Sequence, residues 1–181
     1  MRDVLISLKP YYYYLIGEGI KKVEARKSCP KAEDWSRNSW FYMSRDEKSF
    51  EKIPKEFQEK YRKHFGKVGM RFVCDRIDKF VNFVPIYTLV QTCLTTEQIR
   101  EYLNGKNGYG WHITDLVVYD EPRELCEFLQ VKAIRGYHKK DEPKTEGINV
   151  PKLLQSSRIE VSFLTRPPQS WCYIEPRQTA D

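Results

Sequence analysis

Residues 19–26 read Gly-Ile-Lys-Lys-Val-Glu-Ala-Arg, a glycine turn followed by a short strand pattern that carries charge on one side. Successive side chains of a strand point to opposite faces, so Lys22, Glu24 and Arg26 share one face. The apolar residues Val23 and Ala25 share the other face and are expected to contact a core. The charged face therefore predicts a surface or a cleft.

Lys21 is out of phase with this charged face, because it lies three residues before Glu24 at the exit of the turn. Glycine adopts positive φ at no steric cost, so a turn at Gly19 could bring the Lys21 ammonium into the same cleft. If the charged face lines a cleft, the turn could therefore bring Lys21 together with Glu24 and Arg26.

The composition limits the architecture and the class of partner. With 181 residues, 40% of them hydrophobic, the chain can form one sizeable core, so we expect one domain or one domain with an appendage. The 31 Lys and Arg residues exceed the 25 Asp and Glu residues, which suits a polyanionic partner but equally a soluble basic protein. Aromatic residues make up 14% of the chain, and rings beside basic residues can stack on bases, which favours nucleic acid.

The five cysteines are odd in number and widely spaced, without the short separations of zinc sites, so we expect neither a disulfide framework nor a metal site. Nothing else in the sequence indicates a cofactor. The chain shows no secretory leader and no apolar run near 18 residues, so we expect no membrane partner and a cytoplasmic location.

The residue patterns predict helices mixed with strands, an α+β class. Thr95 and Gln98 have the spacing of a capping box, so a helix is expected to start there and to stop before Gly105. The expected strands are residues 4–8, 39–44, 69–78, 111–119 and 158–164, and the other expected helices are residues 11–16, 54–65 and 123–129.

The residues also indicate the character of four segments. The charged face of the helix at 54–65 carries Lys55, Lys60, Arg62 and Lys63, which we interpret as a solvated surface in preference to a phosphate-binding one. Residues 81–87 are interrupted by Pro85, and residues 132–150 are expected to form a mobile loop. Residues 166–173 are stiffened by two prolines, and Trp171 and Tyr173 point to one side, so we expect this tail to pack on the core, completed by Ile174.

Gly19, Lys21, Glu24 and Arg26 match the signature of the ASCH domain, glycine-x-lysine-x-x-glutamate-x-arginine, which this chain resembles. Residues 4–10 are similar to the first strand of that family, residues 109–122 to its late strand and closing turn, and residues 166–173 to the tail of its phage-encoded members. The resemblance implies a PUA-like mixed β-barrel with flanking helices at residues 1–128 and, at 129–181, a loop and C-terminal extension packing on the core.

The resemblance implies a binding module for RNA or a modified nucleoside. Lys21 and Arg26 would meet a phosphate or a base edge, since lysine supplies a point charge and arginine a planar fork. Glu24 would hold one of these cations or accept from an exocyclic amine, while Gly19 and Trp111 complete the ligand-binding set. Alternatively, Glu24 and Arg26 form a fixed ion pair that ties two strands together.

A second implication is an enzyme, because the resemblance extends to acetylcytidine amidohydrolases and to relatives that cut RNA. Those amidohydrolases carry a threonine nucleophile where this chain has Glu24. If the chain is a hydrolase of acylated nucleosides or RNA, Lys21 and Glu24 form the acid and base pair, and His112 is a further candidate. A third class, an interaction protein, rests on the proline-rich tail, and no feature names its protein partner.

Overall fold

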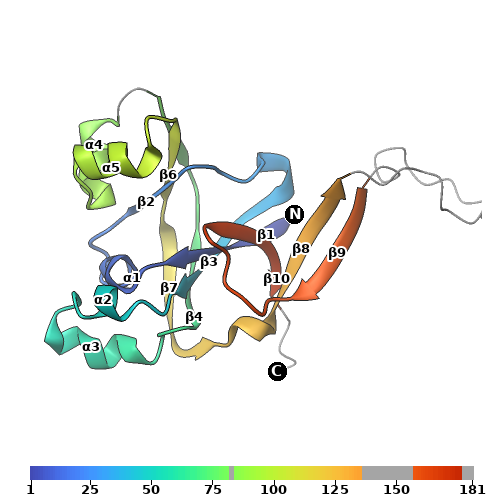
Figure 1. Ribbon diagram of the computed structural model, residues 1–181, viewed down its shortest axis with the longest axis horizontal. Helices are drawn as coiled ribbons and strands as arrows, with labels where there is room; N and C mark the ends of the chain where they lie inside the picture. Colours follow the sequence, from blue (N-terminus) through green and yellow to red (C-terminus); the bar gives the residue numbers. More distant parts are fainter. Residues whose placement is uncertain (82–83, 136–156, 177–181) are drawn as a thin grey trace, which may run out of the picture.

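The computed structural model describes residues 1–81, 84–135 and 157–176, which form a mixed α+β fold (Figure 1). The α+β class expected from the sequence is confirmed. The strands are β1 (Arg2–Leu8), β2 (Val23–Arg26), β3 (Trp35–Met43), β4 (Val68–Val73), β5 (Ile77–Phe80), β6 (Gly108–His112), β7 (Thr114–Arg123), β8 (Phe128–Arg135), β9 (Ser157–Phe163) and β10 (Trp171–Pro176). The helices are α1 (Pro10–Gly17), α2 (Glu47–Phe50), α3 (Lys55–Arg62), α4 (Ile86–Thr92) and α5 (Thr96–Leu103), with 3₁₀ turns at Ala32–Asp34 and Leu125–Glu127.

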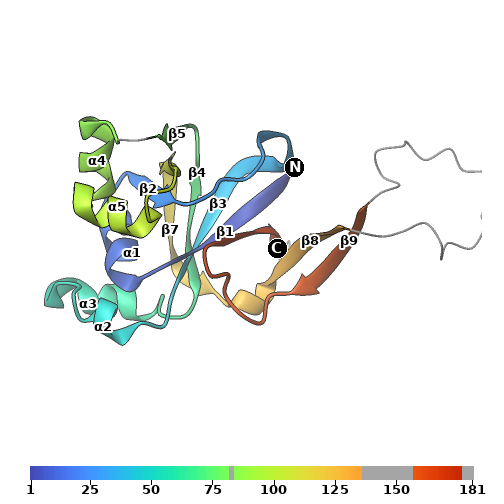
Figure 2. The same ribbon diagram turned by 45° about the horizontal axis from the view of Figure 1, so that its top comes forward.

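The strands form a sheet of seven strands in the order β7-β4-β3-β1-β10-β8-β9 and a sheet of three in the order β2-β6-β5. Strands β7 and β9 stand at the two ends of the strand order of the seven-stranded sheet. The helices gather at one end of the molecule, and the β8–β9 pair projects at the other (Figures 1 and 2). None of the described helices has the length and apolar character needed to span a membrane.

Strand β1 lies at the centre of the larger sheet, parallel to β3 on one side and antiparallel to β10 on the other. Its residues Val4, Leu5 and Ile6 are fully buried. Val4 and Ile6 join the main core, whereas Leu5 faces a second cluster around Phe128. The nearly continuous apolar run of β1 therefore reflects burial of the strand on both faces.

The C-terminal strand β10 pairs with β1 and with β8, so a segment from the end of the chain lies beside its first strand. The rings of Trp171 and Tyr173 lie on one side, with centroids 5.4 Å apart, and both pack on the main core. Ile174 belongs to the second cluster instead, because alternation along β10 turns it to the opposite face. The expectation that Ile174 completes the contact of the two rings is therefore wrong.

Two of the predicted helices follow their residue patterns. Thr95 Oγ1 accepts from the Gln98 amide at 3.2 Å and Gln98 Oε1 accepts from the Thr95 amide at 2.8 Å, so the predicted capping box opens α5. In α3, Tyr61 is buried and Phe57 packs on the main core. The apolar face of that helix is thus the face that the spacing predicted.

Several predicted elements differ from the structure. The strand predicted at 69–78 is β4 followed by β5, and the strand predicted at 111–119 is β6 followed by β7, which belong to different sheets. The helix predicted at 123–129 is wrong: the end of β7, a 3₁₀ turn and the start of β8 lie there. Residues 132–135 of the predicted loop belong to β8, and residues 136–150 lie outside the described residues.

The domain boundary expected after residue 128 falls at the start of a strand, since β8 begins at Phe128. β8 and β10 belong to the same sheet as β1. The described part of the C-terminal extension therefore continues the sheet of the N-terminal part.

Candidate functional site

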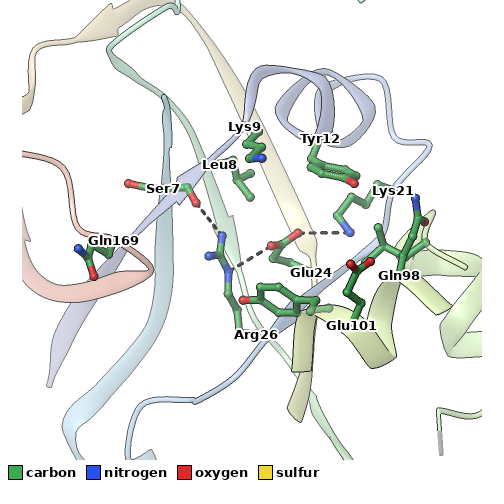
Figure 3. A pocket seen from close by; sticks show the side chains of 13 residues that line it. Ser7, Leu8, Lys9, Tyr12, Lys21, Glu24, Arg26, Gln98, Glu101 and Gln169 are labelled. Carbon is green, nitrogen blue, oxygen red and sulfur yellow. Dashed lines mark hydrogen bonds and ion pairs between the residues drawn. The ribbon is translucent and has the colours of Figure 1, made fainter. Parts of the chain in front are cut away.

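A cavity of about 490 Å³ lies between β1, α1, β2 and α5, with one residue of the segment before β10 in its wall (Figure 3). Its lining mixes charged, amide and tyrosine side chains with a few aliphatic ones. The lining residues are Ser7, Leu8, Lys9, Tyr12, Lys21, Glu24, Ala25, Arg26, Leu94, Gln98, Glu101, Tyr102 and Gln169. Three of the four signature residues, Lys21, Glu24 and Arg26, thus share one cavity.

The turn after α1 brings Lys21 into this wall. Gly19 has φ +69°, the left-handed region that glycine adopts without strain, and the Lys21 amide donates to Leu15 O at 2.9 Å. The Lys21 ammonium then lies 3.3 Å from Glu24 Oε2. Gly19 itself does not line the cavity, so its part in the site is the turn.

Strand β2 supplies Glu24 and Arg26, whose side chains point to the cavity together (Figure 3). Arg26 Nε lies 3.1 Å from Glu24 Oε1, an ionic contact, and that nitrogen makes no hydrogen bond within the described residues. Arg26 Nη2 donates to Ser7 O of β1 at 2.7 Å, and Lys21 Nζ donates to Thr92 O of α4 at 2.6 Å. The expected ion pair is present, and its arginine ties β2 to β1 through a backbone carbonyl.

These three side chains are held away from water. Lys21 is 2% exposed, Glu24 7% and Arg26 6%. Removing charges from water is costly unless they are paired and hydrogen-bonded, and here one carboxylate compensates two cations. Thr92 O takes one of the three N–H donors of the Lys21 ammonium, Glu24 lies in ionic contact with it, and a carboxylate has about four acceptor positions. The cluster can therefore both donate to a ligand and accept from one.

Two tyrosine rings line the same cavity, Tyr12 from α1 and Tyr102 from α5. Lys21 Nζ lies 5.6 Å from the centroid of the Tyr12 ring, within reach of a cation–π interaction. Burial raises the pKa of the Tyr12 hydroxyl, and the charge of Glu24 raises it further. Burial also raises the pKa of the Tyr102 hydroxyl, against the opposing charge of Arg26. Both hydroxyls therefore stay protonated at neutral pH, and the rings offer flat surfaces.

Trp111 lies outside the wall of the cavity. It pairs with Glu24 across the strands β6 and β2, but its side chain is fully buried in the main core, with its ring 5.2 Å from Trp35 and 6.1 Å from Trp171. A ligand in the cavity does not reach this ring. The structure therefore does not bring Trp111 together with the other expected ligand-binding residues.

His112 also lies outside the wall, because it pairs with Val23 and so lies on the face of the smaller sheet opposite to Glu24. Its Nε2 lies 2.9 Å from Asp78 Oδ2, and the Arg76 guanidinium lies 2.9 Å from the same ring nitrogen. Thr88 of α4 donates to Asp78 Oδ2 as well. Asp78 thus joins His112 of the smaller sheet to Thr88 of α4, and His112 does not accompany Lys21 and Glu24.

Sequence reasoning missed the residues that α5 and the C-terminal segment contribute. Gln98, Glu101 and Tyr102 are spaced by three and four positions, which places them on one face of the helix that the capping box predicted. That spacing was a usable signal, whereas no local pattern indicates Gln169. Within the ranges that the structure describes, no group of three or more His, Cys, Asp or Glu side chains could hold a metal ion.

No protein-family model matches the sequence, and no curated protein matches it at a significant level. Among solved structures, the ASCH protein of Zymomonas mobilis is similar, at 21% identity over 67% of this chain and 70% of that chain, with a TM-score of 0.41. A tyrosine-to-phenylalanine variant of it gives 20% identity over 67% and 73%, with a TM-score of 0.43. At these values the likeness assigns neither a ligand nor an activity to this chain.

Proposed function

We propose that the cavity binds RNA at an unpaired nucleotide, or a free modified nucleoside. The observation that carries this proposal is the buried cluster of Lys21, Glu24 and Arg26 in the wall of a cavity that two tyrosine rings also line. A volume of about 490 Å³ falls among those of small-molecule sites. It suits one splayed-out nucleotide, the form in which single-stranded RNA presents its bases.

Each group of the wall has a part in this proposal. Lys21 and Arg26 meet a phosphate or the acceptors of a base edge, and Glu24 accepts from an exocyclic amine. Tyr12 and Tyr102 stack on the base, an interaction that is sequence-tolerant because every base has a π face.

The wider assignment is part of the same proposal. The signature at residues 19–26, gathered in one cavity of an α+β fold, supports an ASCH domain of PUA-like barrel type at residues 1–128 with an extension at 129–181. All five cysteines are free thiols, which supports a reducing compartment such as the cytoplasm.

The test compares the cavity with the surface of α3. A fluorescently labelled single-stranded RNA of mixed sequence is titrated at fixed salt into wild type, Lys21→Ala, Arg26→Ala and Lys60→Ala. We expect the first two variants to lose about tenfold or more in affinity and Lys60→Ala less than about threefold, because positioned contacts contribute more than diffuse charge. Equal losses at all three positions would contradict a defined site.

A control guards against loss of the fold, since Lys21 and Arg26 are buried. Melting curves are recorded for every variant, and Tyr102→Leu changes a wall residue that is 37% exposed. If the cavity is the site, Tyr102→Leu also weakens RNA binding while its melting curve stays close to wild type.

A hydrolase of acylated nucleosides or RNA is the second candidate, favoured by the 3.3 Å separation of Lys21 Nζ and Glu24 Oε2 and by Glu101 in the same wall. Glu24 would act as base toward water, with Lys21 as the acid. We expect little product from N4-acetylcytidine, because a carboxylate replaces the hydroxyl nucleophile of the active relatives. Turnover that disappears in Glu24→Gln would reverse this ranking.

A further inference from the structure

We propose that Gln169 is a specificity-determining residue of this cavity, where its amide reads the hydrogen-bonding edge of a nucleobase. The inference rests on the proposed function and adds a segment that lies more than 140 residues from the signature in the sequence. Gln169 is the one residue of the segment between β9 and β10 in the cavity wall. In the view of Figure 3, it lies on the opposite side of Arg26 from Gln98 and Glu101.

The segment that carries Gln169 is fixed at both of its ends. At its start, Leu164 is buried and its amide donates to Phe128 O at 3.0 Å. At its end, the Ser7 amide donates to Ser170 O at 3.1 Å, and Trp171 Nε1 donates to Ser28 Oγ at 3.0 Å. Prolines at 167 and 168 restrict the backbone between these anchors. The backbone that carries Gln169 is therefore ordered before a ligand binds, which leaves only the side chain to be ordered on binding.

Ser7 connects this segment to the charged cluster. Its carbonyl accepts from Arg26 Nη2 at 2.7 Å, and its amide donates to Ser170 O. One residue of the central strand β1 thus holds the guanidinium on one side and the backbone next to Gln169 on the other. The spacing between the Arg26 and Gln169 side chains is consequently set by the sheet.

The amide of Gln169 is free to meet a ligand. The side chain is exposed, and its amide makes no hydrogen bond to the residues that the structure describes. Gln98, the other glutamine of the wall, instead uses its Oε1 to cap α5. A carboxamide presents a donor and an acceptor in one plane, and base edges present donors and acceptors in an order that differs between bases. The ligand class is therefore a nucleobase, and we expect its preference among bases to depend on how the donor and acceptor of its exposed edge align with this amide.

The experiment measures the affinities of AMP, CMP, GMP and UMP for wild type, Gln169→Ala, Gln169→Glu and the control Gln130→Ala by calorimetry. Gln130 lies in β8, away from the cavity wall. We expect wild type to separate its best and worst nucleotide by about fivefold or more, as one good paired contact provides. Gln169→Ala should compress this spread below about twofold, and Gln169→Glu should change the order of the four, because an acceptor replaces the amide donor. Gln130→Ala should keep both spread and order.

The outcomes separate this inference from the proposed function. If Gln169→Ala keeps the wild-type spread and order, or if wild type binds all four nucleotides equally, Gln169 is no specificity determinant, although the cavity can still be the site. If wild type binds none of the four and no single-stranded RNA, or if Lys21→Ala and Arg26→Ala bind as wild type does, the proposed function fails and the inference fails with it. Because Gln169 is exposed, its variants should melt as wild type does, so loss of the fold does not confound the result.

Discussion

Two groups of basic residues in this molecule differ in burial and hardly in pairing distance. In the cavity, Lys21 and Arg26 lie 3.3 and 3.1 Å from Glu24. On α3 and the residue after it, Lys60 lies 2.7 Å from Glu18, Arg62 3.0 Å from Glu47 and Lys63 3.7 Å from Asp120. The side chains of Lys21 and Arg26 are 1% and 8% exposed, whereas those of Lys60, Arg62 and Lys63 are 52%, 53% and 47% exposed.

Burial determines what each group can do. An exposed ion pair exchanges its partner for water and salt at little cost, so its geometry is weakly specified. A buried cation has no such substitute, so its partner fixes it in place. From the sequence, the charged face of α3 was interpreted as a solvated surface. The structure agrees, since three cations of that face are about half exposed and paired with carboxylates of the same chain. A net positive charge therefore does not by itself locate a ligand site.

The sharpest test removes the carboxylate of each group. Glu24→Gln leaves Lys21 and Arg26 buried without a counter-charge and should lower the free energy of unfolding by about 3 kcal/mol. Glu47→Gln removes only the exposed partner of Arg62 and should cost less than about 1 kcal/mol. Urea unfolding followed by circular dichroism measures both free energies. Equal losses would contradict the conclusion that burial distinguishes the two groups of basic residues.

The charged cluster was predictable because its signals are local. Alternation along residues 22–26 placed Glu24 and Arg26 on one face, and a glycine turn could supply Lys21. The same alternation included Lys22, which precedes β2, is exposed and does not line the cavity. The same signals left open whether that face meets water or a cleft. The answer depends on Tyr12, Tyr102 and Gln169, which come from three different parts of the chain and meet only when the sheet has formed.

Helix α4 shows why another part of the fold could not be predicted. Its apolar residues Ile86 and Val90 are largely exposed, whereas Thr88 and Thr92 are fully buried. This reverses the pattern by which a surface helix is identified. The buried hydroxyls are satisfied by tertiary and local acceptors, Asp78 Oδ2 for Thr88 and Leu89 O for Thr92, which the sequence does not reveal.

The break between β6 and β7 was hidden for a related reason. Residues 111–119 are rich in β-branched and aromatic side chains throughout, so propensity predicts one strand. The structure ends β6 at His112 and gives Asp115 a positive φ of 46°. The Ile113 amide donates to Lys22 O, and Thr114 Oγ1 donates to Val73 O. A partner next to the smaller sheet and one within the larger sheet thus set the break.

A second prediction uses the buried histidine that follows α3. Burial, together with the charges of Lys63 and Lys60, lowers the pKa of His64 to about 4. Since the unfolded chain binds the proton near pH 6.5, it takes up more protons than the folded chain as pH falls from 7 to 5. The free energy of unfolding should therefore decrease by about 2 kcal/mol over this range from His64 alone.

The matched variant is His64→Gln, which removes the titrating group and leaves a polar side chain near Tyr13 Oη, now 3.0 Å from His64 Nδ1. Urea unfolding at pH 7, 6 and 5 should show a smaller slope with pH for this variant than for wild type. Such a result would show that a buried charge-bearing group near α3 affects stability strongly, although the exposed cations of the same region do not. Identical slopes would assign the pH dependence to other groups.

The smallest expected effect lies within the α3 face itself, where Arg62 and Lys63 are both about half exposed. The Arg62 guanidinium lies 4.0 Å from the centroid of the Phe50 ring and 5.1 Å from that of Phe65, in addition to its pair with Glu47. Arg62→Ala should therefore cost about 1 kcal/mol through lost ring contact and packing. Lys63→Ala, which loses a 3.7 Å contact to the fully exposed Asp120, should leave the unfolding curve unchanged within error.

Raising NaCl from 0.05 to 0.5 M should remove little of the Arg62 effect, because salt screens the ion pair but not the contact with the rings. If salt instead abolishes the Arg62 effect, charge alone stabilises this surface, and the distinction between the two basic regions is one of degree.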